Sequence, residues 1–147
     1  MNQDELQWDK LLKIKTTGRD DTHSNQYCYP YEPTPYCVLE RMANYGILDK
    51  KNVLLDTIGI EYDERIFAAA KENEKNAVSG RMTSFVEQHA EEYVVPAEAD
   101  CCYFFNPFSV ELLRKVLARI YDSCYENEKS MRLFFYYPSD EYVSCLM

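Results

Sequence analysis

The stretch "NVLLDTIGIEYDERIF", residues 52–67, decides the expected fold because it contains two apolar runs that each end in an acid. The runs "VLLD" and "IGIEYD" are separated only by Thr57. Each run has the pattern of a buried strand that brings a carboxylate to the edge of a sheet. Neighbouring parallel strands need a connection of about a dozen residues or more, usually a helix. The sequence has no such connection between Asp56 and Thr57, so this junction needs an explanation.

The remaining sequence alternates amphipathic helices with continuous apolar strands. Helical spacing predicts helices over residues 3–14, 35–46, 63–80 and 109–127, and a last helix beginning within 139–147. Apolar runs predict further strands over residues 82–88, 101–105 and 131–138. This alternation is typical of an α/β fold, a three-layer αβα sandwich whose mainly parallel sheet is covered on both faces.

Composition and charge narrow the classes of function. The 147 residues suffice for about one domain, and 46% hydrophobic with 28% charged residues indicates a folded chain. The net charge of −9 argues against a broad nucleic-acid surface, which needs clustered Lys and Arg. No run reaches the roughly 18 apolar residues of a membrane span, and the acidic start "MNQDELQWDK" does not resemble a secretory signal. We therefore expect a cytoplasmic protein that does not bind membranes.

The six cysteines and two histidines show no metal-binding pattern. The cysteines have no paired CxxC spacing and no nearby histidine motif, which argues against a zinc site. In a cytoplasmic protein we expect all six to be reduced thiols that pack as small hydrophobic side chains.

Polar residues follow the expected strands at their carboxyl ends, where parallel sheets bind ligands. These residues are Asp56, Glu61 with Asp63, Gln88 with His89, and Asn106 with Pro107. The sequence therefore predicts a ligand site along this edge of the sheet.

Three stretches carry a resemblance to a known family. They are "YEPTPYCVLERM" at residues 31–42, "GIEYDERIFAAAKEN" at 59–73 and "CYFFNPFS" at 102–109. At this spacing they resemble the bacterial class I, Rossmann-like methyltransferases that use S-adenosylmethionine. The resemblance extends from about residue 29 to residue 142. It implies a Rossmann-like sheet, S-adenosylmethionine as cofactor and transfer of its methyl group to an acceptor.

The resemblance also implies cofactor-binding residues. Glu61, at the end of the second strand of the family's sheet, corresponds to the acid that binds the two ribose hydroxyls of the cofactor. A carboxylate suits this role because it accepts strong, charge-assisted hydrogen bonds from both hydroxyls. Asp56 corresponds to the acid that ends the first strand and faces the methionine part. His89 lies at the position that faces the adenine, where the family usually has Asp or Asn.

A second group of residues is implied near the methyl acceptor. Asn106 and Pro107 lie where the family has its motif after the fourth strand, between the methyl donor and the acceptor. The Asn106 oxygen would hold the hydrogens of an amine acceptor, but Phe108 replaces the second proline of the amine-methylating motif, so the sequence assigns no acceptor. Tyr31 and Thr34 belong to an aromatic, proline-rich segment that is expected to cover the cofactor pocket.

Two departures from the family stand out. The chain has no GxGxG motif, and its only glycines are Gly18, Gly46, Gly59 and Gly80. The expected strands also stop at the fifth, whereas the family has a sixth and a seventh. We interpret the missing glycine loop as residues of the native protein that are absent between Asp56 and Thr57. The alternative is a true deletion, which fuses both runs into one strand of about ten residues, roughly 33 Å long.

The sequence thus predicts an N-terminal helix and lid segment over residues 1–34 and a methyltransferase-like domain over 35–147. Its predicted activity is methyl transfer from S-adenosylmethionine to a small-molecule or protein acceptor, without a metal. The alternative is an inactive relative that binds no cofactor and acts as an acidic interaction module. A weaker hypothesis is a dinucleotide-binding α/β protein, because an acid after the second strand also suits a nicotinamide ribose. The oligomeric state stays open.

Overall fold

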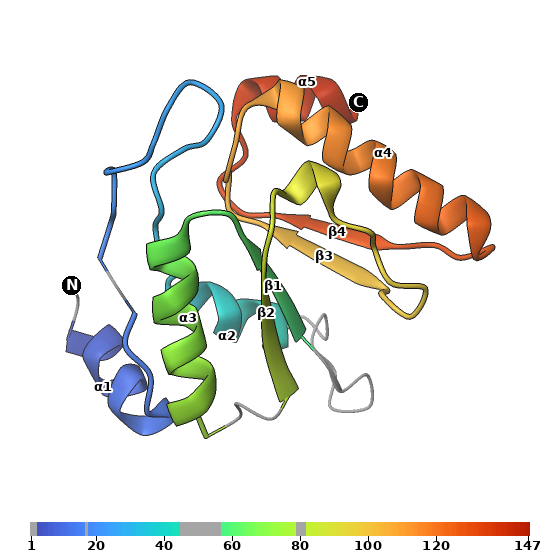
Figure 1. The fold of residues 1–147 in the computed structure, drawn as a ribbon. Coiled ribbons are helices and arrows are strands. Elements are labelled where there is room, and N and C mark those ends of the chain that lie inside the picture. Colours follow the sequence, from blue (N-terminus) through green and yellow to red (C-terminus); the bar gives the residue numbers. More distant parts are fainter. Residues whose placement is uncertain (1–2, 17, 45–56, 79–81) are drawn as a thin grey trace. The chain divides into compact units, whose positions relative to one another are not determined.

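The computed structural model describes residues 3–16, 18–44, 57–78 and 82–147 (Figure 1). Its contacts divide the chain into two compact units. Unit 1 comprises Met1–Gly18 and Glu32–Glu87, and unit 2 comprises Arg19–Tyr31 and Gln88–Met147. The expected division at residue 34, into a lid segment and a methyltransferase-like domain, is not tested by this grouping and stays a prediction.

Unit 1 is built on a parallel βαβ arrangement. Strand β1 (Thr57–Glu61) leads into helix α3 (Glu64–Asn76) and then into strand β2 (Thr83–Glu87). The two strands are parallel and in register from Thr57 beside Thr83 to Glu61 beside Glu87. Helix α3 packs against both strands, and the three elements lie side by side in Figure 1. Glu61 and Glu87 consequently share the carboxyl end of this sheet.

A close contact between Gly59 and Phe85 fixes the pairing of β1 with β2. The two residues are register partners, and the Phe85 ring lies across the glycine. A Cβ atom placed on Gly59 would lie 2.5 Å from Cδ1 and 2.6 Å from Cε1 of Phe85. Only glycine leaves room for the ring in this position, which explains a glycine inside a strand.

Two further helices, α1 (Gln3–Leu12) and α2 (Tyr36–Asn44), complete unit 1. The Tyr36 hydroxyl donates to the buried Asp9 carboxylate at 2.9 Å, and the Thr16 amide donates to the same carboxylate at 2.9 Å. The Trp8 and Tyr36 rings stack with their centroids 5.6 Å apart. A buried carboxylate with several donors thus joins the two helices, as the cost of burying a charge requires.

Helix α3 ends earlier than the sequence predicts. The expected helix over residues 63–80 stops at Asn76, and Ala77 is extended with ψ 145°. The Asn73 side chain forms a reciprocal pair with Lys15: it accepts from the Lys15 amide and donates to the Lys15 carbonyl, each at 2.8 Å. The Val78 amide donates to the Leu12 carbonyl at 3.1 Å. These bonds to the end of α1 and to the segment after it draw the chain out of the helix, and Gly80 lies outside the described residues.

Unit 2 contains a second parallel pair. Strand β3 (Cys101–Phe104) is followed by helix α4 (Val110–Glu126) and by strand β4 (Arg132–Phe135). The strands pair in register from Cys101 beside Arg132 to Phe104 beside Phe135. A short 3-10 helix η2 (Ala90–Glu92) packs against α4, and helix α5 (Asp140–Leu146) also packs against α4.

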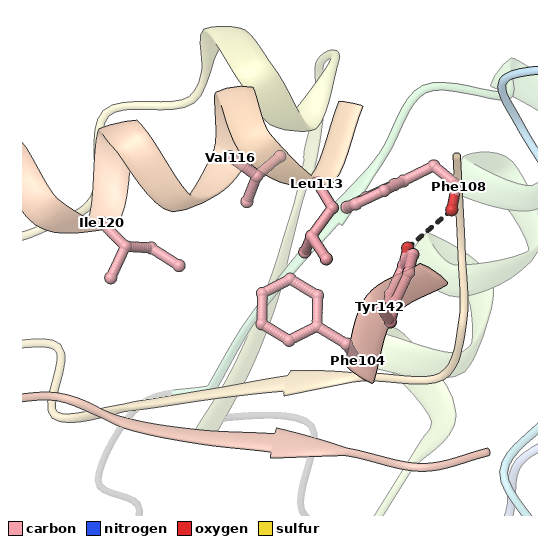
Figure 2. Close-up of a cluster of buried hydrophobic side chains, with 6 residues drawn as sticks. All are labelled: Phe104, Phe108, Leu113, Val116, Ile120 and Tyr142. Carbon is pink, nitrogen blue, oxygen red and sulfur yellow. Dashed lines mark hydrogen bonds between the residues drawn. The ribbon is translucent and has the colours of Figure 1, made fainter. Parts of the chain in front are cut away.

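The apolar core of the protein's described part lies in unit 2 and is drawn in Figure 2. Helix α4 supplies one side of it, because its apolar residues recur at helical spacing and face the sheet. Strand β3, the turn after it and helix α5 supply the rest. The buried residues of this core are Phe104, Phe108, Leu113, Val116, Ile120 and Tyr142.

The α/β class predicted from the sequence is confirmed, as are both kinds of element in alternation and the parallel pairing of strands. The described strands form two sheets of two strands each. The run "VLLD", Asp56 and the questioned junction with Thr57 lie outside the described residues. Within the described ranges, no helix is long and apolar enough to cross a membrane.

Candidate functional site

Glu61 ends strand β1, at the edge where the sequence predicts cofactor binding. Its side chain is half-buried, and one carboxylate oxygen accepts from the Asp63 amide at 2.8 Å. Burial raises the pKa of Glu61, and the nearby Asp63 charge raises it further, although the amides of Asp63 and Tyr62 partly oppose the shift. The ionised carboxylate is therefore held at some cost at this strand end.

Asp63, only two residues away, has a structural role. It is the N-cap of α3, and its buried carboxylate accepts from the Arg65 amide at 2.9 Å and from the Ile66 amide at 3.4 Å. Its ion pair with the Arg65 guanidinium measures 3.1 Å. Burial acts to raise the pKa of Asp63, but the hydrogen bonds from Arg65 and Ile66 outweigh it and lower the pKa. Two neighbouring acids thus have opposite pKa shifts, and the carboxylate of Asp63 serves to cap α3.

The turn after β3 contains the second predicted position, Asn106. Its backbone is left-handed, with φ 40°, which is a costly conformation for a residue other than glycine, although Asn tolerates it best. The Asn106 Oδ1 atom is buried and has no hydrogen-bond partner among the residues that the structure describes. Strain and an unsatisfied buried acceptor at one residue are features that concentrate at functional sites.

The residues after Asn106 are held by a segment far away in sequence. The Tyr29 amide donates to the Pro107 carbonyl at 3.0 Å, and the Ser109 amide donates to the Tyr27 carbonyl at 2.7 Å. These two bonds form a short antiparallel bridge between residues 27–29 and 107–109. Part of the segment that the sequence assigns to a lid is therefore bonded to the turn that carries the predicted acceptor residues.

The other predicted site residues are distributed over both units. Tyr31, in unit 2, exchanges backbone hydrogen bonds with Asp20, each 3.0 Å long. Thr34, in unit 1, is half-buried and precedes α2. His89, in unit 2, is exposed at the N-cap of η2, where its carbonyl accepts from the Glu92 amide at 3.1 Å.

The structure brings some of these residues together and leaves others untested. Within unit 2, the segment that ends at Tyr31 lies against the turn of Asn106 and Pro107. Glu61 and Thr34 belong to unit 1, so their grouping with the turn in one cofactor site stays a prediction. Asp56 lies outside the described residues.

The sequence reasoning missed the residues that hold the turn, above all Tyr142. Its hydroxyl donates to the Phe108 carbonyl at 2.6 Å (Figure 2). A tyrosine in a short C-terminal helix reads as an ordinary core residue, and nothing in its local sequence indicates a bond to residue 108. The antiparallel bridge of residues 27–29 has no signal either, since prolines and tyrosines predict only an extended segment.

No group of three or more His, Cys, Asp or Glu residues within the described ranges is placed to hold a metal ion. The arrangement instead offers two kinds of polar contact. A carboxylate at the end of β1 can accept hydrogen bonds from hydroxyls, and a buried amide oxygen after β3 can accept from an N–H or O–H group. Comparison of the chain with protein-family models, curated proteins and solved structures finds no match in any of the three.

Proposed function

We propose that the protein is an S-adenosylmethionine-dependent methyltransferase with a Rossmann-like sheet. The pairing of the strands is the observation that carries this proposal. In a sheet of order 3-2-1-4-5, strand two lies beside strand three, and strand four beside strand five. The described pairs are β1 with β2 and β3 with β4, and both are parallel. In the proposed sheet they are the second strand with the third and the fourth strand with the fifth, and the complete three-layer sandwich is part of the proposal.

The residues at the carboxyl ends of these strands fit the cofactor in part. Glu61 is a half-buried carboxylate with a raised pKa, so donors from a ribose diol would stabilise its ionised form. Asp56, Tyr31, Thr34 and His89 remain proposed contacts of the same cofactor. The glycine-rich loop is the part that the sequence lacks, because GxGxG does not occur in it.

Asn106 is proposed to orient the methyl acceptor. Its buried oxygen has no partner among the described residues, so an N–H or O–H group of the acceptor would satisfy it. This hydrogen bond would turn a lone pair of the acceptor toward the methyl group of the cofactor. S-adenosylmethionine, when bound, supplies an electrophilic methyl group. Pro107 fixes the backbone directly after Asn106, and the role of both residues is positioning. The acceptor is a small molecule or a protein, and a cytoplasmic location is part of the same proposal.

Calorimetric titration with S-adenosylmethionine tests the proposal, and the chain offers a matched control. Glu61 and Glu87 are register partners at the ends of β1 and β2, and Glu87 is exposed. We expect Glu61→Ala to weaken cofactor binding about 10-fold to 100-fold, because bonds to a charged group contribute about 1.5–3 kcal/mol. Glu87→Ala should bind like the unchanged protein.

Two results would count against the proposal. Equal losses in Glu61→Ala and Glu87→Ala would remove Glu61 from the site. If the folded, unchanged protein gives no heat with millimolar S-adenosylmethionine, the chain is not a methyltransferase as it stands. The inactive interaction module is then the better hypothesis.

A further inference from the structure

The turn of residues 106–109 combines a costly conformation at Asn106 with hydrogen bonds to two distant parts of the chain. Asn106 has a positive φ of 40° and a buried side-chain oxygen without a partner among the described residues. Each feature favours a rearranged turn, because strain and an unsatisfied acceptor both cost free energy. Such a residue keeps its conformation only when its neighbours fix the backbone on one or both sides.

The Phe108 carbonyl is a group of this turn that neither helix α4 nor the bridge to residues 27–29 uses. Helix α4 begins its hydrogen-bond ladder one residue later, where the Leu113 amide donates to the Ser109 carbonyl at 3.0 Å. The bridge to residues 27–29 uses the Pro107 carbonyl and the Ser109 amide. The Phe108 carbonyl therefore needs another donor, since a buried carbonyl without one is costly. Tyr142 supplies it at 2.6 Å.

Tyr142 is itself fixed by two contacts and by its burial. Its amide donates to the hydroxyl of Ser139, the N-cap of α5, at 3.2 Å. Its ring meets the Phe135 ring edge-on, with centroids 5.9 Å apart. The whole side chain has no exposed surface, and Figure 2 shows its hydroxyl directed at the Phe108 carbonyl. The position of the hydroxyl is thus set by helix α5 and strand β4 together.

We propose that Tyr142 is a positioning residue whose hydroxyl holds Asn106 in its strained, acceptor-binding conformation. The bond to Phe108 and the bridge to residues 27–29 fix the turn from two separate parts of the chain. This inference rests on the proposed function in one respect, because it takes Asn106 as a contact of the methyl acceptor. The position of the turn itself does not depend on the cofactor.

Tyr142→Phe removes the hydroxyl and keeps the ring, and Ile120→Val is its matched control. Ile120 belongs to the same core and is 4% exposed, but none of its side-chain atoms can donate to the turn. Hydrogen exchange of the Tyr29 and Ser109 amides reports on the turn, because both are bonded across its bridge. We expect Tyr142→Phe to lower the protection of these two amides about tenfold more than Ile120→Val does. The Asn106 side-chain amide signals should also shift in Tyr142→Phe only.

Several outcomes would overturn the inference. One is an equal loss of protection in both variants, which would mean that Tyr142 only adds stability. Another is an unchanged pair of Asn106 signals in Tyr142→Phe. If that variant does not fold, the unchanged protein still gives a test. Its Tyr142 hydroxyl proton should exchange slowly enough to be seen by NMR in cold solution, and rapid exchange would contradict the bond.

The proposed function and this inference can fail separately. Tyr142→Phe should still bind S-adenosylmethionine, because it leaves the Glu61 carboxylate, the proposed ribose contact, in place. Absence of cofactor binding with the expected exchange pattern would defeat the methyltransferase proposal alone. Cofactor binding without the exchange pattern would defeat only the role of Tyr142.

Discussion

The two units of this protein share a strand–helix–strand arrangement but bury different kinds of side chain. Each contains a parallel strand pair joined through a helix, β1–α3–β2 in unit 1 and β3–α4–β4 in unit 2. Unit 2 buries a cluster of apolar side chains between its helices and its sheet. In unit 1, the buried residues of the described part are Tyr36 and two carboxylates, Asp9 and Asp63, and both carboxylates are hydrogen-bonded.

The difference extends to the strands of the two units. The strands of unit 1 have no fully buried residue, whereas Phe104 of β3 is buried. Unit 1 carries Glu61 at the end of β1, where burial raises the pKa of the carboxyl group, so that its ionised form is kept at some cost. Unit 2 carries a strained turn, which needs a rigid apolar support. The comparison predicts that mutations of the same type have different effects in the two units.

The largest expected effect comes from truncating the core of unit 2. Leu113 is completely buried, so Leu113→Ala should lower the free energy of unfolding by about 2–5 kcal/mol. Leu39→Ala, on α2 of unit 1, removes a side chain that is 38% exposed and should cost less than about 1 kcal/mol. Urea unfolding followed by circular dichroism measures both. A cost for Leu39→Ala as large as that for Leu113→Ala would contradict the comparison.

In unit 1, we expect a larger loss of stability from a substitution at Gly59, where the backbone lies against the Phe85 ring. Gly59→Ala would place a Cβ atom 2.5 Å from Phe85, so the ring must move, at a cost of about 1–3 kcal/mol. Gly18→Ala is the control, because nothing lies within 4 Å of the added atom. Urea unfolding of both variants, followed by Trp8 fluorescence, measures the difference. If Gly59→Ala is as stable as Gly18→Ala, the register of β1 with β2 is wrong.

The smallest expected effect is a difference between Asp63 and Glu61 in how each contributes to stability as the pH changes. The lowered pKa of Asp63 adds stability that is present above its unfolded pKa of about 3.9 and is lost as the pH falls through the folded value. The raised pKa of Glu61 acts in the opposite sense, so its ionised form costs stability above the folded pKa. At pH 7, Glu61→Gln should therefore raise stability and Asp63→Asn should lower it, each by under about 1 kcal/mol.

Unfolding at pH 7 and near pH 3 tests this sign difference. The loss caused by Asp63→Asn should shrink near pH 3, because the unchanged carboxyl is then protonated more often. A loss of stability in Glu61→Gln at pH 7 would mean that this carboxylate is part of the structural framework. Glu61 would then no longer be a proposed contact of the cofactor.

Much of the fold could be predicted from local sequence. Helices α3 and α4 follow from apolar residues at helical spacing, and Asp63 and Ser109 occupy their N-cap positions. The helix expected to reach Gly80 ends at Asn76, because Asn73 bonds to Lys15, 58 residues away, and the Val78 amide bonds to the Leu12 carbonyl at the end of α1. Propensity cannot anticipate such a tertiary contact.

The residues of the candidate site could be predicted from the sequence, but the contacts that hold them in place could not. An acid or amide after an apolar strand is visible in sequence, which is how Glu61 and Asn106 were found. The bond from Tyr142 to Phe108 depends on where α5 packs, 34 residues further along the chain. Nothing in the neighbouring residues encodes that packing.

Binding of S-adenosylmethionine, resolved by residue, tests the central proposal most directly. In a titration followed by amide NMR spectra, we predict that the signals of Glu61 and Tyr62, at the end of β1, shift with cofactor concentration. The signals of α4 residues such as Ile120 should stay in place. Unchanged Glu61 and Tyr62 signals at millimolar cofactor, in a protein with the dispersed spectrum of a folded chain, would contradict the proposed function.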